Sequence, residues 1–532
     1  MKRYIRIFFV LIFICLCQAL FSDPLEIYFG PGGGFSPINR ARIINFADGK
    51  TASGTLANAL IDVIRRQEPD GLIKIALYSM SDYDTLNELI EAAYEKAIHV
   101  KLILDAAADW TADSRKKILD RVRNARIKSQ KNNKPFDFQI KFVTKQIMIE
   151  RGRFRILDNG KLINGTMHEK FGLFYAKGNP IPYDGFCGSA NVSFTSDKIY
   201  AENRVFFFNR PAVTRQFQEE FARLWNEYGT SVAGPCTSEM FVPVSPVAGD
   251  VEVYFNAEPE NEITMTRLDQ VLEKLIDRIE PNGSLDLAMF SLTSPDMARA
   301  LIRAAERNPK AQIHILLDHS QLDDSNKDES IQGPGLEREA QRLGLKNFQV
   351  RYKWRSNAYG YDPQEHKIQM VSFRSFFLHH KVVVVNRCHL AIGSYNWSGS
   401  GENLNIEDLM IFNGSWRDHQ PVVDAFLREF DTVWNSRRPQ CPVLRPILGT
   451  PQSVTGSEGR ALQEKIIHLL SNADNLKITQ ALDRGAFLSL ADLCRKTNIS
   501  TTEISNYLPK LIEIGLLCKY KKNGIEGYSQ AD

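Results

Sequence analysis

The stretch FLHHKVVVVN, from Phe377 to Asn386, places two histidines and a lysine directly before four consecutive valines. The valines predict a strand that is buried on both faces. Ionisable side chains at the mouth of such a strand are costly to bury unless a neighbouring group satisfies them or a function uses them. The segment MHEKFGLFY, from Met167 to Tyr175, carries the same His-x-Lys pattern. The motif is therefore present twice.

The chain repeats itself over most of its 532 residues. Each copy alternates strand patterns with amphipathic helix patterns, and the second strand of each ends in aspartate, at Asp105 and Asp318. This order predicts an α/β fold in which residues 25–241 and 251–445 each form a mixed sheet flanked by helices. The matching segments are LEIYFGP (25–31) with VEVYFNA (251–257), residues 75–93 with 287–305, and FQEEFARLWN (217–226) with FLREFDTVWN (426–435).

Five polar residues recur in the same order in both copies. After His-x-Lys, each copy reaches Gly-Ser-x-Asn, and a glutamate lies 11 residues after each asparagine. A lone histidine on an apolar strand is usually a core residue, but that interpretation must here explain the same polar set twice. His380 should point away from the face that His379 and Lys381 share. The candidate catalytic residues are His168, Lys170, Ser189, Asn191 and Glu202 in the first copy, and His379, Lys381, Ser394, Asn396 and Glu407 in the second.

This doubled pattern resembles the phospholipase D superfamily, whose signature is His-x-Lys-x4-Asp followed by Gly-Ser-x-x-Asn or a close variant. The resemblance covers most of residues 25–440 and implies two pseudo-symmetric phospholipase D-like repeats. It also implies that His168 is the nucleophile and His379 the acid. The sequence departs from the signature at Tyr175 and Asn386, where aspartate is expected. In the family this aspartate is mainly a support, so the change bears on efficiency more than on the reaction class.

The chemistry also follows from the groups themselves. Two imidazoles facing one phosphodiester can divide the work, one attacking phosphorus while the other protonates the leaving oxygen. Lysines supply positive charge, and Ser and Asn side chains can donate hydrogen bonds to the phosphate oxygens. Glutamates can hold the imidazole tautomer, as the carboxylate of a catalytic triad does. We expect no metal or cofactor to be required.

The amino terminus predicts export. The basic residues MKRYIR precede an apolar run from Ile7 to Phe21, which is typical of a signal peptide over residues 1–22, with an uncleaved anchor as the alternative. The expected location is the periplasm or cell envelope. Apart from Cys15 and Cys17 in the apolar run, the chain has six cysteines, and none of them forms a CxxC motif. A disulfide between Cys236 and Cys441 is one hypothesis, and two unpaired cysteines is the other.

Two basic or modular segments leave their roles open. Residues 112–145 are rich in Lys and Arg. They form either a solvated helix face or a surface that attracts phosphate. Residues 459–532 follow a linker and resemble a winged helix-turn-helix, although Pro509 falls inside the expected reading helix. Nucleic-acid binding and protein interaction both remain possible for this tail. The net charge of +3 favours neither.

Three functions fit these observations. The first is an exported phospholipase D-like phosphodiesterase acting on phospholipid at a membrane surface, through a phosphohistidine. The second is a nuclease of the same superfamily, and the third is an inactive homologue that binds phosphate groups.

Overall fold

The computed structural model describes the two repeats and most of the tail. Residues 1–22, the segment 242–250 between the repeats, the linker before the tail at residues 447–459, Cys441 and residues 523–524 lie outside the described residues. The described residues are 25–30, 42–45, 55–107, 112–198, 200–232, 236–240, 251–256, 267–322, 333–353, 358–362, 367–370, 377–416, 418–434, 468–469, 472–482, 487–513, 517–522 and 525–530.

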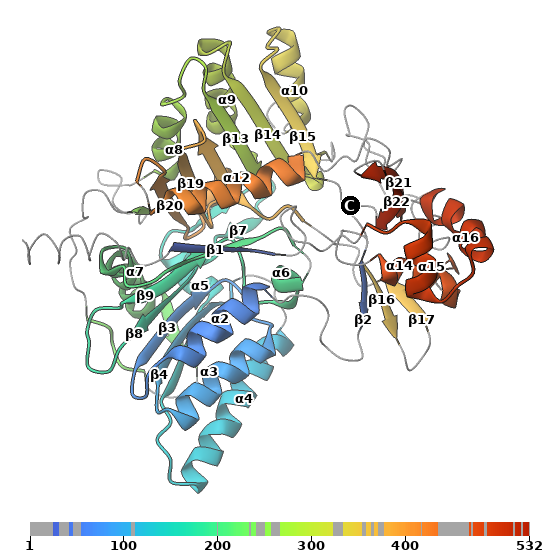
Figure 1. Ribbon diagram of the computed structural model, residues 1–532. Coiled ribbons are helices and arrows are strands. Elements are labelled where there is room, and N and C mark those ends of the chain that lie inside the picture. Colours follow the sequence, from blue (N-terminus) through green and yellow to red (C-terminus); the bar gives the residue numbers. More distant parts are fainter. Residues whose placement is uncertain are drawn as a thin grey trace, which may run out of the picture.

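The first repeat forms a mixed sheet, in blue to green in Figure 1. Its order within the described residues is β1-β10-β9-β8-β3-β4-β5-β11. Strands β3, β4 and β5 are parallel, and every other neighbouring pair is antiparallel. The strands are β1 (Leu25–Phe29), β3 (Leu72–Leu77), β4 (His99–Asp105), β5 (Phe138–Val143), β8 (Lys170–Tyr175), β9 (Asp184–Gly188), β10 (Asn203–Phe207) and β11 (Gly229–Ser231). A separate strand pair joins β6 (Phe154–Ile156) to β7 (Leu162–Asn164).

The second repeat builds the same sheet. Its order is β12-β20-β19-β18-β13-β14-β15, which matches the first sheet strand for strand from β1 to β5. The predicted duplication and its mixed sheets are therefore confirmed. The strands are β12 (Glu252–Phe255), β13 (Ser284–Met289), β14 (Gln312–Asp318), β15 (Phe348–Lys353), β18 (Lys381–Val385), β19 (His389–Gly393) and β20 (Asp408–Asn413).

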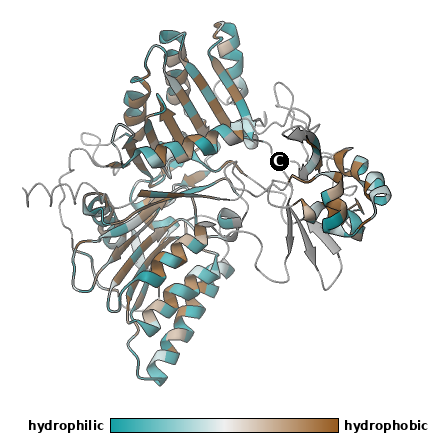
Figure 2. Cartoon of the chain, in the orientation of Figure 1, coloured by the Kyte–Doolittle hydropathy of each residue, from teal (hydrophilic) through white to brown (hydrophobic). Residues whose placement is uncertain are grey.

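Helices cover both faces of each sheet. In the first repeat they are α2 (Thr55–Arg66), α3 (Tyr83–Glu95), α4 (Ala112–Lys131), α5 (Lys145–Glu150), α6 (Phe194–Lys198) and α7 (Pro211–Arg223), which a π-helical turn extends over Leu224–Tyr228. In the second they are α8 (Leu268–Ile276), α9 (Pro295–Arg307), the 3₁₀ turn His319–Leu322, α10 (Gly333–Arg342), α11 (Gly399–Asn403) and α12 (Gln420–Trp434). Figure 2 shows mainly hydrophobic strands beneath helices whose outer faces are hydrophilic.

The valine strand β18 shows how the layers are held. Val383 and Val385 pack into the core of the second repeat, whereas Val382 and Val384 pack into a core shared by both repeats. A strand with apolar partners on both faces needs an uninterrupted apolar run, which is what the four valines supply.

In the shared core, the carboxy-terminal helix of each repeat packs against its own sheet and also against a strand of the other repeat. Helix α7 packs on β12 of the second repeat, with the Phe217 and Phe255 ring centroids 5.4 Å apart. Helix α12 packs on β1 of the first repeat in the same way, with Phe29 and Phe426 6.3 Å apart. Figure 1 shows α12 lying between the two sheets. Each repeat therefore completes the core of the other.

Two smaller units complete the described structure. Strand β2 (Arg42–Asn45) joins β16 (Ala358–Asp362) and β17 (Lys367–Met370) in a small sheet. The tail consists of α14 (Ala473–Ala481), α15 (Leu490–Thr497), α16 (Thr501–Glu513) and the antiparallel pair β21 (Leu517–Lys522) and β22 (Ile525–Gln530).

The tail has a hydrophobic core made of its own residues. A capping pair is present at the start of α16, because Glu503 N donates to Ser500 Oγ at 3.3 Å and Ser500 N to Glu503 Oε2 at 3.2 Å. Pro509 lies inside α16. The winged-helix assignment remains a prediction. In the described part of the chain, no helix is both long and apolar enough to cross a membrane.

Candidate active site

The two histidines lie just before matching strands, each tied to the opposite repeat. His168 N donates to Ile406 O, and Ile406 N donates to Thr166 O, both at 2.9 Å. On the other side, His379 N donates to Ala201 O, and Ala201 N to Phe377 O, again at 2.9 Å. These parallel bridges place the segment before each catalytic strand beside the segment that carries the other repeat's glutamate.

The glutamates pair with the histidines across the repeats. His168 Nδ1 lies 2.8 Å from Glu407 Oε2, and His379 Nδ1 lies 2.9 Å from Glu202 Oε1. Both carboxylates are fully buried, whereas each imidazole is 12% exposed. The carboxylates therefore orient the imidazoles and leave the opposite ring nitrogen, Nε2, to face a ligand.

The two predicted serines hold the glutamates. Ser189 Oγ donates to Glu202 Oε2 at 2.7 Å, and Ser394 Oγ donates to Glu407 Oε2 at 2.6 Å. Both serines are buried, so their hydroxyl hydrogens are directed at the carboxylates rather than outward. These contacts make the serines positioning residues in this structure.

The predicted asparagines differ from the serines. Within the part of the chain that the structure describes, the buried Oδ1 atoms of Asn191 and Asn396 accept no hydrogen bond. Burying an amide oxygen without a partner is costly, so these oxygens are suited to accept a hydrogen bond from water or from a donor group of a ligand.

The lysines are buried beneath the imidazoles. Lys170 Nζ donates to the carbonyl of His168, and Lys381 Nζ donates to that of His379 at 2.8 Å. Each ammonium also lies over an aromatic ring, Tyr78 at 5.3 Å and Phe290 at 5.0 Å. Burial lowers the pKa of both lysines, and that of Lys381 falls to about 7.

Electrostatics favour neutral imidazoles opposite ionised glutamates. Burial lowers the pKa of both histidines, and the neighbouring lysines lower it further against the opposing effect of the glutamates. The pKa of His379 falls to about 4. Burial alone would raise the pKa of Glu202 and Glu407, but the facing imidazoles and lysines outweigh it and lower the pKa. Lys381 acts on His168 and Lys170 on His379, so the two halves form one electrostatic unit.

Asp105 and Asp318, which end the second strand of each repeat, support the site, although the sequence pattern did not assign them to it. Asp105 Oδ2 accepts from Met167 N at 2.7 Å, and Asp318 Oδ2 accepts from Leu378 N at 2.8 Å. Each fixes the residue that precedes a histidine. Their duplicated position at the end of the second strand was the available signal.

The two histidine motifs are not symmetric below the site. His380 is buried as expected, with Nδ1 2.9 Å from Asn203 Nδ2 and Nε2 3.3 Å from Glu429 Oε1. Its counterpart is Glu169, which lies near Glu220 and Asp408. Burial raises the pKa of Glu169 well above its ordinary value, and these two carboxyls raise it further. The surroundings of Glu169 therefore favour its protonated form over the carboxylate.

The two departures from the superfamily signature lie far from the imidazoles. Tyr175 ends β8 and is buried, and Asn386 follows β18 in a turn with φ of 54°. Asn386 Oδ1 accepts from Glu280 N at 3.1 Å, and its Nδ2 donates to Arg278 O at 2.8 Å. Five residues of strand separate these positions from the lysines by about 16 Å. Neither side chain can touch a ligand held by the histidines.

The described residues bear on the cysteines and on metal binding as follows. Cys236 is half-buried with its sulfur 3.9 Å from Ile140 O, while Cys441 lies outside the described part, so their pairing stays a prediction. Among the side chains that the structure describes, no group of three or more His, Cys, Asp or Glu is arranged to hold a metal ion.

Comparison with known proteins assigns the family. Residues 67–225 and 275–434 each match the family described as "cardiolipin synthase, PLD-like domain". Together these segments cover more than half of the chain. The chain belongs to this family. Both PLD-like segments contain the full set of five candidate residues from their repeat.

Individual relatives of this PLD-like chain are distant. Mitochondrial cardiolipin hydrolase of Homo sapiens is 25% identical over 181 residues, which cover 34% of this chain and 55% of the hydrolase. The Xenopus laevis hydrolase is 22% identical over 210 residues, covering 38% and 80%. The chain thus spans about half the length of the human relative. Phosphatidylserine synthase of Haemophilus influenzae has a similar crystal structure, with a TM-score of 0.50 at 12% identity over 78% of this chain and 87% of the synthase, which shows a shared fold.

Proposed function

We propose that this protein is a phosphodiesterase that hydrolyses or transfers the head group of a phospholipid through a phosphohistidine intermediate. The observation that carries the proposal is the crossed arrangement of two imidazoles, each with its Nδ1 within 2.9 Å of a buried glutamate of the other repeat. Such an arrangement presents two oriented nitrogens to one phosphodiester, as attack and protonation require.

The first step forms the phosphohistidine. Neutral His168 attacks phosphorus through Nε2, and the bond from phosphorus to the head-group oxygen breaks. Protonated His379 gives its Nε2 proton to that oxygen, which leaves as an alcohol. The negative charge of the bound phosphodiester raises the pKa of the nearby imidazole, which offsets the low value of the free site.

The second step regenerates the protein. His379, now neutral, takes a proton from water or from an acceptor alcohol as that oxygen attacks phosphorus. The bond between phosphorus and His168 breaks, and the nitrogen electron pair returns to the ring. Lys170 and Lys381 face the added negative charge in both steps, and their burial strengthens that interaction because little water screens it.

The direct test is covalent labelling. Incubation with a phospholipid labelled at phosphorus should leave an acid-labile, alkali-stable label on the protein, and His168→Ala should abolish it. His168→Ala and His379→Ala should each abolish turnover while His99→Ala retains it. His99 begins β4 beside Asp137, at the opposite end of that strand from Asp105 and the histidine site. Turnover near wild type in either site variant would exclude the two-histidine mechanism.

A substrate panel separates the alternatives. Release of a head group from phospholipid supports the proposal, whereas cleavage of DNA without head-group release would establish the nuclease. Binding of phosphate esters with neither label nor turnover would establish the inactive homologue. DNA is included as a substrate because helix α4 is basic and could attract the phosphates of a nucleic acid.

We also propose that the protein is exported and works at a membrane surface. The support is the basic and apolar segment over residues 1–22. Amino-terminal sequencing of the protein recovered from the cell envelope tests this. A chain that keeps Met1 and stays in the cytoplasm would contradict it.

A further inference from the structure

A groove runs along α4 in the first repeat. It is a cavity of about 870 Å³ between α4 and the ends of β5 and β11. Leu119, Val122 and Phe142 form an apolar floor, and Arg115, Lys116 and Arg123 form a basic rim. The helical residues 115, 119, 122 and 126 recur at spacings of four, three and four, so apolar and basic side chains share one face. We call this cavity the α4 groove.

The α4 groove lies on the same sheet edge as the histidines. Ala106, which lines it, follows Asp105, and the Asp105 carboxylate holds the backbone of Met167 next to His168. In the sheet, β4 is two strands from β8, so the groove begins about 10 Å from the catalytic segment. A ligand in the groove is therefore a near neighbour of the site.

Helix α4 is strongly basic. The helix carries eight basic and two acidic residues, whereas α10, at the matching place in the second repeat, carries two of each. Arg123 pairs with Asp120 at 2.8 Å, but the two side chains are 70% and 38% exposed. Such a surface pair is weak, so an anion can compete for the guanidinium.

The floor favours a lipid over a nucleic acid. Grooves that bind single strands combine positive charge with exposed aromatic rings on which bases stack. Phe142 is only 4% exposed, so it offers no stacking surface, while the aliphatic Val232 beside it is 43% exposed. An acyl chain needs apolar contact alone.

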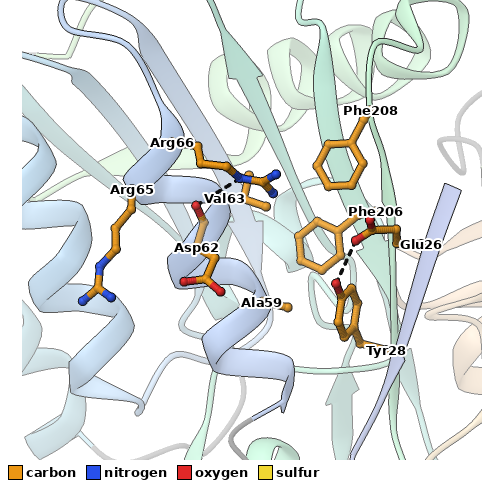
Figure 3. A pocket seen from close by; sticks show the side chains of 9 residues that line it. All are labelled: Glu26, Tyr28, Ala59, Asp62, Val63, Arg65, Arg66, Phe206 and Phe208. Carbon is orange, nitrogen blue, oxygen red and sulfur yellow. Dashed lines mark hydrogen bonds between the residues drawn. The ribbon is translucent and has the colours of Figure 1, made fainter. Parts of the chain in front are cut away.

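A second cavity, drawn in Figure 3, lacks this charge. Its volume is about 480 Å³, and Arg65 and Arg66 are balanced by Glu26 and Asp62. It is lined by Phe206 near the far end of β10, away from Glu202, which precedes that strand.

We propose that the α4 groove holds an anionic phospholipid of the membrane surface, with its phosphate on Arg115, Lys116 and Arg123 and the start of an acyl chain over the apolar floor. This proposal deepens the proposed function and rests on it, because a lipid held here brings the bilayer to the histidines.

The test compares two triple variants of the full chain. Arg115→Gln, Lys116→Gln and Arg123→Gln together make the groove variant, and Lys117→Gln, Lys128→Gln and Lys131→Gln make a control on the same helix with the same loss of charge. The measured quantity is the affinity for phosphatidylcholine vesicles containing phosphatidylglycerol, divided by that for phosphatidylcholine alone. Both variants keep residues 1–22, so the comparison between them cancels binding through that segment. We expect the groove variant to lower it by about 100-fold and the control to lower it far less.

Turnover distinguishes failure of this inference from failure of the proposed function. The ratio of turnover on anionic vesicles to turnover of soluble bis(p-nitrophenyl) phosphate should fall in the groove variant and persist in the control. A wild type that turns over neither substrate would contradict the proposed function, while the vesicle ratio would still decide whether the groove binds lipid. Equal weakening of vesicle binding in both variants would overturn the groove. Loss of DNA binding in the groove variant without any vesicle effect would also overturn it and assign the groove to nucleic acid.

Discussion

Glu407→Gln tests the crossed site most sharply. The carboxylate accepts three hydrogen bonds: from His168 Nδ1 and Ser394 Oγ at Oε2, at 2.8 and 2.6 Å, and from Asn405 Nδ2 at Oε1, at 3.0 Å. Glutamine has nearly the same shape, but one end of its amide donates. Turned toward Asn405, that amide meets another donor, because Asn405 Oδ1 already accepts from Thr166. Turned toward His168, it forces the imidazole proton onto Nε2, where the nucleophilic electron pair is needed.

The magnitude follows from the geometry. At 2.8 Å and an effective dielectric constant of about 20, a carboxylate attracts an imidazolium by about 6 kcal/mol, before desolvation is subtracted. With part of this attraction retained by the neutral amide, we expect a loss of about 3–4 kcal/mol of transition-state stabilisation, or about 100- to 1,000-fold in turnover. The unsatisfied buried donor should also lower the free energy of unfolding by about 1–3 kcal/mol.

Glu202→Gln provides the matched control. Glu202 Oε2 accepts from the hydroxyl of Ser189, which can rotate and accept from an amide instead. We therefore expect a similar loss of turnover with a smaller loss of stability than in Glu407→Gln. The assays are turnover of a soluble chromogenic diester and urea unfolding. Wild-type turnover in Glu407→Gln would refute the reasoning, as would a greater destabilisation by Glu202→Gln.

Four further predictions follow from the same contacts. Burial lowers the pKa of Lys381 to about 7, so kcat/KM should fall as pH rises through that value. Lys381→Arg should move this fall in the pH profile to higher pH, because a guanidinium stays protonated. A fall at the same pH in Lys381→Arg would assign the titration to another group. Because burial raises the pKa of Glu169 above its ordinary value of 4.5, its stabilising contribution is present at low pH and lost as pH rises, so the wild type should lose stability relative to Glu169→Gln as pH rises above that value in urea unfolding; parallel curves would contradict this. EDTA should leave turnover unchanged, because Lys170 and Lys381 supply the positive charge, and a loss that a divalent ion restores would count against the mechanism. Deletion of residues 456–532 should leave a soluble, active core, because the tail has a hydrophobic core of its own; an insoluble product would place the domain boundary elsewhere.

Much of the fold was predictable because short stretches of sequence indicate its strands and helices. Four valines in succession indicate a strand with two buried faces, and the structure places alternate valines in two different cores. The duplicated order of strands and helices predicted two matching sheets. The recurrence of His, Lys, Ser, Asn and Glu in the same order selected the candidate residues, since an independent origin for both sets is improbable.

The asymmetry beneath the site was not predictable in this way. Glu169 and His380 occupy matching positions, but their environments come from residues distant in the sequence. Whether a buried carboxyl is ionised depends on the charges and water around it, and neither is visible in a motif. The tail illustrates the same limit, because its helices and strand pair are evident while its partner is not.

The sequence by itself determined that two copies of one strand–helix unit exist and which side chains each contributes. Only the tertiary structure decided that the glutamate of each unit pairs with the histidine of the other unit. His168 and Glu407 are 239 residues apart, and the glutamate 11 residues after Asn191 serves the histidine of the other repeat. Spacing along a chain constrains contacts within a turn, a helix or a hairpin. Contacts across a pseudo-twofold interface depend instead on how two sheets pack against α7 and α12, and the free energy of that packing is distributed over the whole shared core.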